Sequence, residues 1–181
     1  MTEKIAYQDQ DCNLTLKEGL EIYYSLLKSA EINNNAIKKI EDDPGSSIMR
    51  NHDCTHVIFG LDISLEQEAM LDTWTLYGTQ FSWLDLLKYS FTNKELLKLY
   101  KVFFTEVGIK GFIKLYQNTR IVKKLIKSRT KAMIKKWPYN CDDELLNKRI
   151  CDLRKDYGIK ILEKSERSVQ KLNWSGSLSN S

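Results

Sequence analysis

The sequence predicts an all-α fold, a single-domain bundle of about seven or eight helices, and three observations favour it. The chain of 181 residues contains only eight glycines and two prolines, so few residues would interrupt a helix. Apolar residues recur at helical spacing along most of the chain, and no two segments alternate as paired strands would. The apolar fraction of 42% and charged fraction of 29% are typical of a globular protein.

We expect one domain over residues 1–174 and a disordered tail over residues 175–181, which are small and polar. No apolar run reaches the roughly 18 residues that span a bilayer. The first residues lack the layout of a signal peptide. The four cysteines show no framework spacing, which favours reduced thiols. These features predict a cytoplasmic chain, soluble or peripheral to a membrane.

The first half of the chain carries clear helix signals. Thr15 and Glu18 form a capping box before an apolar run, which predicts a helix over residues 16–31. Between this helix and residue 60, turn and capping residues divide the chain into three expected segments. The expected segments are a short helix over 35–40, a turn over 43–45, and a helix from Ser46 or Ser47 to Phe59 that Gly60 caps.

In the second half, periodic apolar segments alternate with capping residues and glycines. Pro138 is expected to end the longest of these segments. The expected helices run from Ser64 to Gly78, over 83–89, over 92–106, over 109–136 with a break near Asn118 and Thr119, and from Asp142 or Asp143 to Gly158.

The chain contains only two histidines, His52 and His56, and they lie four residues apart. On a helix this spacing places both side chains on one face, as in helices that bind zinc through two imidazoles. Asp53 borders the same face. Two alternatives stay open: the histidines form a surface pair or a core pair, and Asp53 forms a salt bridge with Arg50 or another nearby cation.

A further ligand is expected from the next helix, which offers Glu66 and Glu68. Gly60 and the turn after it allow that helix to fold back beside the first. Glu68 is favoured because core-type residues flank it, so that it can face inward. The alternative is that both acids lie in a first helical turn only because the helix dipole favours negative charge there.

His52-Asp53-x-x-His56, followed after eleven residues by Glu68, resembles the signature of the Coq-four family of ubiquinone (coenzyme Q) biosynthesis proteins. Gly60 also fits the pattern. A weaker match is formed by Gln117, Asn118, Arg120, Trp137, Leu153, Arg154, Gly158 and Ile159. The resemblance covers residues 44–160. The stretch before His52 is shorter than in the family, and the residues after Glu68 lack its Gly-Leu-Pro-like turn. These two departures bear on the inferred ring substrate more than on the inferred metal site.

The resemblance implies an all-α fold and one divalent metal, usually zinc, on His52, Asp53, His56 and Glu68. It also implies a cavity for an isoprenoid lipid and a peripheral position at the inner face of a membrane, the mitochondrial inner membrane in a eukaryote. The family role is oxidative decarboxylation at C1 of a prenylated quinone precursor, or non-catalytic scaffolding of other quinone-biosynthesis enzymes. A homodimer is compatible with either role.

The residue types themselves suit zinc, iron, manganese or cobalt. Zinc has no redox chemistry, so a zinc site would only hold and polarise a carboxylate or phenolate of the substrate. A metal-dependent phosphohydrolase is a third functional class, since an adjacent His-Asp pair marks that group as well. It requires a further ligand, and the chain has no third histidine.

Between Ile109 and Lys136 the chain carries ten lysines or arginines and no acid. This pattern suits an anionic membrane surface, recognition of a phosphate or prenyl diphosphate with Arg120 as the best candidate, or merely a solvated lysine face. Nucleic acid is disfavoured, because the net charge is only +4 and aromatic residues are not interleaved with the cations. Trp74 and Tyr77, with Phe81 and Trp83, would line a lipid cavity or belong to the core.

Overall fold

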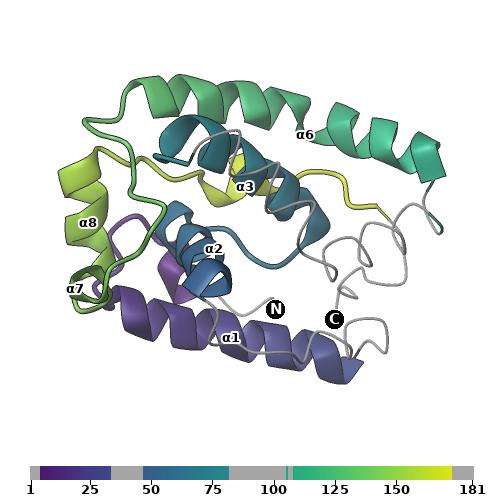
Figure 1. Ribbon diagram of the computed structural model, residues 1–181. Helices are drawn as coiled ribbons and strands as arrows, with labels where there is room; N and C mark the ends of the chain where they lie inside the picture. Colours follow the sequence, from purple (N-terminus) through teal and green to yellow (C-terminus); the bar gives the residue numbers. More distant parts are fainter. Residues whose placement is uncertain (1–4, 34–46, 82–104, 106–107, 173–181) are drawn as a thin grey trace.

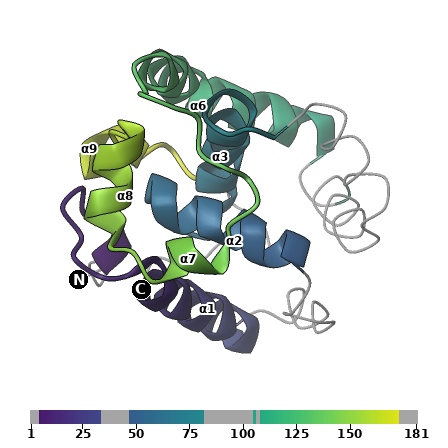
Figure 2. The same ribbon diagram turned by 60° about the vertical axis from the view of Figure 1, so that its left-hand side comes forward.

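The computed structural model describes residues 5–33, 47–81, 105 and 108–172. Its helices lie in successive layers, with α6 over α3, α3 over α2, and α2 over α1 (Figure 1). A view from the side shows the short helices α7, α8 and α9 gathered at one end of these layers (Figure 2). The all-α prediction is therefore confirmed: the described residues form helices and only two isolated β-bridges.

The described elements are seven α-helices preceded by one 3-10 turn, η1. Their bounds are η1 Ala6–Gln8, α1 Leu16–Asn33, α2 Ser47–Phe59, α3 Leu65–Gly78, α6 Gly108–Lys131, α7 Asp143–Leu146, α8 Ile150–Tyr157 and α9 Lys164–Arg167. None of them is long and apolar enough to cross a membrane.

The helices that position the site begin and end where the sequence predicts. The capping box before α1 is formed, since the Thr15 and Glu18 side chains each accept a hydrogen bond from the other's backbone N–H. Gly60 follows α2 with a φ of +70°, a conformation that glycine adopts without strain. Ser64 precedes α3 as its N-cap residue.

Two expectations about the long basic helix α6 are wrong. The helix continues through Asn118 and Thr119 without a break, and the buried Thr119 hydroxyl is satisfied inside it by donating to the carbonyl of Leu115. It also ends at Lys131, five residues before the expected end. The following residues bond to other parts of the chain instead, as the Trp137 N–H does to the Gly78 carbonyl.

One final helix is expected from Asp142 or Asp143 to Gly158, but the structure has two helices there, α7 and α8. A further helix, α9, follows them. Residues around Arg149 leave the helical path because they pair with the segment before α1. The Leu16 N–H bonds to the Lys148 carbonyl, and the Ile150 N–H bonds to the Leu14 carbonyl. A long-range pairing therefore replaces the local helical bonds.

One buried cation joins the C-terminal end of α2 to the chain around η1. Arg154 of α8 has no solvent exposure, and its five N–H groups point at five backbone carbonyls. The acceptors are the carbonyl oxygens of Ile58 and Val57 in α2 and of Tyr7, Asp9 and Gln10. Burial lowers the pKa of Arg154 to about 10, a value at which it is still charged at neutral pH.

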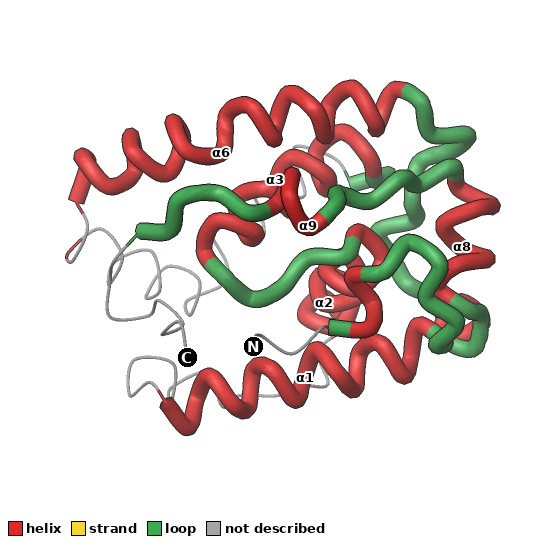
Figure 3. The backbone as a smooth tube through the Cα atoms, turned by 180° about the vertical axis from the view of Figure 1, so that it is seen from behind, coloured by secondary structure: helices red, strands yellow, loops and turns green. Residues whose placement is uncertain are grey.

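The segment after α9 returns along α3, as the view from behind shows (Figure 3). Its Leu172 N–H donates to the Glu66 carboxylate at 2.6 Å, and the Leu172 side chain packs in a small cluster with Ala69 and Leu115. The expected helices over 35–40, 83–89 and 92–106, the turn over 43–45 and the tail over 175–181 lie outside the described residues, apart from the helical residue Thr105. The proposed extent of the single domain stays a prediction.

Candidate metal centre

The candidate centre is built by α2, the turn after it, and the first turns of α3. Gly60 ends α2, and Asp62 and Gln67 fix the turn through two hydrogen bonds: the Asp62 N–H donates to the Gln67 side-chain oxygen, and the Gln67 amide donates back to the Asp62 carboxylate. Asp62 also accepts from the Ser64 N–H. The turn thus aims the first residues of α3 back at α2.

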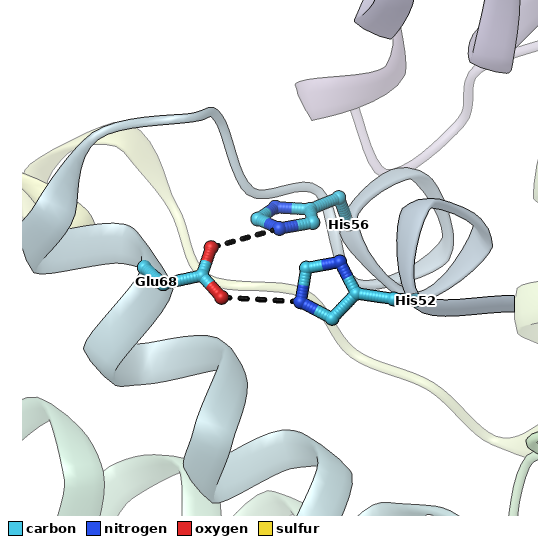
Figure 4. Close-up of side chains that lie close together, drawn as sticks. All are labelled: His52, His56 and Glu68. Atoms are coloured by element: carbon cyan, nitrogen blue, oxygen red, sulfur yellow. Dashed lines mark hydrogen bonds and ion pairs between the residues drawn. The ribbon is translucent and has the colours of Figure 1, made fainter. Parts of the chain in front are cut away.

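His52, His56 and Glu68 meet between the two helices (Figure 4). The Glu68 carboxylate lies 3.1 Å from His52 Nε2 through one oxygen and 3.0 Å from His56 Nε2 through the other. The potential ligand atoms of the three residues lie within 4.8 Å of one another. The prediction that a helix-turn-helix would bring position 68 to both imidazoles is confirmed.

His56 provides a test of whether these side chains fit a cation. Its side chain has no solvent exposure, and neither ring nitrogen makes a hydrogen bond within the described residues. Glu68 Oε2 lies 3.0 Å from Nε2, and this contact is an ion pair. A buried imidazole that makes no hydrogen bond is costly, and a cation placed beside the carboxylate would accept the Nε2 lone pair.

The donor set fits a divalent metal in distance and chemistry. Zinc binds imidazole nitrogen and carboxylate oxygen at about 2.0–2.2 Å, so its tetrahedral ligands lie roughly 3.3–3.5 Å apart. The three side chains need only small shifts to reach this arrangement. The exposed fractions of the His52 and Glu68 side chains, 27% and 40%, show that one side of the centre faces solvent. Three ligands therefore leave a position open.

Asp53, which the sequence groups with the ligands, is not part of this cluster. It is buried, and its carboxylate lies 3.5 Å from Nδ1 of His52, the ring nitrogen that faces away from Glu68. A carboxylate in this place orients the imidazole and raises its basicity as an outer partner of a metal ligand. The alternative salt bridge to Arg50 is not formed, because Arg50 pairs with Asp143.

The charges of the centre reinforce one another. Desolvation would lower the pKa of His52, but the Glu68 charge and hydrogen bonds with Asp53 and Glu68 hold it well above its usual value. Desolvation would raise the pKa of Glu68, but the two imidazoles hold it well below its usual value. In the metal-free protein the centre is therefore a proton-bridged ion pair that a cation can replace.

Glu66, the alternative to Glu68, points elsewhere, since it accepts the backbone N–H of Leu172. Two tyrosines of α1 complete the centre, and helical periodicity alone predicts for them only a place in the apolar run of that helix. The Tyr23 ring lies against His56 with centroids 4.7 Å apart, and burial together with the nearby Asp53 charge raises the pKa of Tyr24. The adjacent pair of tyrosines can be seen in the sequence, but nothing in the sequence indicates which helix the pair contacts.

The three residues expected to bind lipid or phosphate separate into two places. Trp74 is fully buried and stacks on Phe59 with ring centroids 4.6 Å apart, so it belongs to the core. Tyr77 and Arg120 are exposed and line a common groove between α3 and α6. Phe81 contacts Tyr139 instead, and Trp83 lies outside the described residues.

No family model matches the chain, and no characterised protein or solved structure matches it either. Membership of the Coq-four family therefore stays a prediction from motif spacing, whereas the metal centre has its own geometric support: His52, His56 and Glu68 form a group that could hold a metal ion.

Proposed function

We propose that the protein binds one divalent cation, with zinc favoured, through His52, His56 and Glu68, and uses it to hold an oxygen anion of a prenylated ring in quinone biosynthesis. The observation that carries the proposal is the convergence of one carboxylate on two imidazoles across a helix-turn-helix. The ring substrate comes from the motif resemblance. A peripheral position at a membrane surface belongs to the same proposal.

A two-histidine, one-glutamate set with an open side is typical of catalytic rather than structural metal sites. The bound cation would supply Lewis-acid polarisation of a carboxylate or phenolate oxygen. His56, stacked on Tyr23, would hold the buried side of the centre, while His52 and Glu68 form its solvent-facing rim. Asp53 would keep His52 oriented with Nε2 toward the cation.

The reaction that the resemblance implies is oxidative decarboxylation at C1 of the ring. The carboxyl group leaves as carbon dioxide and a hydroxyl group derived from water replaces it, while the two electrons released reduce one molecule of oxygen to hydrogen peroxide. A zinc ion does not carry these electrons. With zinc, the role of the centre is limited to positioning, and the electron-rich ring itself must react with oxygen.

Elemental analysis of the purified protein, with mass spectrometry of co-purified lipid, tests the proposal. We expect about one divalent metal ion per wild-type chain and less than about a tenth of that in His56→Ala, as for loss of one of three ligands. A prenylated aromatic acid incubated in air should release carbon dioxide with wild type only. Stoichiometric metal in the folded variant, or full turnover by a metal-free variant, overturns the proposal.

A non-catalytic scaffold is the second candidate, and one feature of α6 favours it. The first half of this helix exposes Ile109, Phe112, Ile113 and Tyr116, which lie at helical spacing with exposed fractions of 43–73%. An apolar stripe of this kind suits a protein partner. A scaffold would keep its partner after loss of the metal, whereas the enzymatic role would end with it.

A further inference from the structure

A groove of about 410 Å³ runs along the seam between α3 and α6, and none of its lining residues belongs to the metal centre. Four of its eight lining residues are cations and none is an acid. The cations are Arg120, Lys123, Lys124 and Lys127, all from α6. Tyr77 and Thr73 of α3 face them and add two hydroxyl groups.

The helical spacing explains why these cations gather at the seam. Leu115, Thr119, Val122 and Ile126 form the buried stripe of α6. Residues one position after this stripe lie on its flank and reach over α3. The flank residues are Tyr116, Arg120, Lys123 and Lys127, with Lys124 beside them. The fold therefore concentrates positive charge at one edge of the helix contact.

Little within the described residues neutralises this charge. Arg120 and Lys124 make no ion pair and no hydrogen bond there, and Lys127 only donates to the Tyr77 hydroxyl at 3.4 Å and lies 4.5 Å above its ring. Lys123 is attracted to Asp72 across the seam. Like charges held on one helix face repel, so an anion that bridges them gains from all of them at once.

We propose that this groove binds a phosphate group, as a phosphomonoester or a diphosphate, through Arg120, Lys124 and Lys127. A guanidinium binds two phosphate oxygens with fixed geometry, and lysines add point charges around the remaining oxygens. The Tyr77 hydroxyl supplies one more donor. The volume is in the range of small-ligand sites, so the groove suits one head group or small anion. This inference does not depend on the metal centre.

Calorimetric titration with sodium pyrophosphate tests the proposal with two matched variants of the full chain. Arg120→Gln/Lys124→Gln removes two groove cations, and Lys110→Gln/Lys114→Gln removes two exposed cations of the same helix outside the groove. Both changes reduce the net charge by two and leave the metal centre intact, so any pyrophosphate bound by metal is common to both. We expect at least about a tenfold loss of affinity for the groove variant and less than about twofold for the other.

The phosphate source is separated with vesicles of phosphatidic acid in phosphatidylcholine. Sedimentation of the protein with these vesicles, reversed by pyrophosphate, identifies a lipid head group as the source. Pyrophosphate binding without sedimentation identifies a free phosphate ester. In either case the groove variant must be the weaker of the two. Equal losses in both variants, or no binding of wild type to either probe, overturns the proposal.

Discussion

Helix α2 contacts two buried polar centres that differ in how completely they are satisfied. At its C-terminal end, the carbonyls of Val57 and Ile58 accept hydrogen bonds from Arg154, whose five donors all have acceptors. The residue just before them, His56, is equally buried, but neither of its ring nitrogens makes a hydrogen bond within the described chain.

This difference separates a structural from a functional centre. A buried charge is tolerated when every donor is matched, and such a network then fixes one arrangement of the chain. A buried imidazole that has an ion-pair contact but no hydrogen bond lowers stability, and a bound ligand recovers part of that free energy. The Arg154 network therefore positions α2, and the α2–α3 centre uses that position to bind a cation.

Arg154→Met gives the largest expected effect, and it acts on the satisfied centre. The substitution leaves up to five carbonyls without donors, each costing about 1–3 kcal/mol when buried. We expect a loss of at least about 4 kcal/mol in the free energy of unfolding, measured by urea denaturation. Arg149→Met is the matched control, because Arg149 is exposed and makes only a surface pair with Asp152. Equal costs for the two variants would contradict the assigned role.

Glu68→Gln acts on the unsatisfied centre and should leave the fold intact. It removes the carboxylate that joins the two imidazoles, so we expect more than about a hundredfold loss of metal affinity, beyond the range of an outer partner. Competition with a fluorescent zinc chelator measures it. Glu66→Gln is the control on the same helix, since the amide oxygen still accepts the Leu172 N–H. Loss of metal in the control rather than in Glu68→Gln would exchange the roles of the two acids.

The sequence predicts the centre well because its determinants are local. Histidines four apart on one helix share a face whatever the tertiary fold, and Gly60 and Ser64 end one helix and begin the next within five residues. Helix geometry then predicts that the side chain of Glu68 faces the two histidines. Helix geometry does not predict the orientation of Asp53, because a residue between two histidines borders their face and can turn to either side of it.

The incorrect helix bounds have a different origin. The break between α7 and α8 depends on backbone pairing with residues at and before the start of α1, more than 130 positions away in the chain, which no local pattern reveals. The early end of α6 likewise depends on bonds to Gly78 and Tyr157. The five acceptors of Arg154 are backbone carbonyls, which every residue carries, so no sequence motif distinguishes them.

Asp53→Asn sharpens the distinction between a ligand and its outer partner. The amide keeps the shape of the side chain but weakens its hold on Nδ1 of His52. We expect a loss of metal affinity of about 10–100-fold, the range for second partners of ligating histidines. The same chelator competition measures it. A loss as large as that of Glu68→Gln would instead make Asp53 a direct ligand, as the motif resemblance implies.

The smallest expected effect is a pH dependence that runs in opposite directions for folding and for metal binding. The pKa of His52 is raised above 6.5 in the folded protein, where desolvation opposes but the Glu68 charge and the hydrogen bonds prevail. Its stabilising pairing with Glu68 is therefore complete below pH 6.5 and is lost as the pH rises through the folded pKa. On the acid side, the contribution of Glu68 is lost as the pH falls through its own lowered pKa.

Metal binding has the opposite sign above pH 6.5, because the cation must displace the proton of His52. We expect metal affinity to rise by about tenfold per pH unit until the folded pKa of His52 is reached, while the stability of the metal-free protein declines over the same interval. Chelator competition and urea denaturation in EDTA measure the two trends. Asp53→Asn should lower the pKa of His52 and bring the plateau of affinity to a lower pH. An affinity that does not change with pH would mean that the cation does not replace this proton. The assignment of the His52–His56–Glu68 centre as a cation site, in contrast to the structural Arg154 network, would then be contradicted.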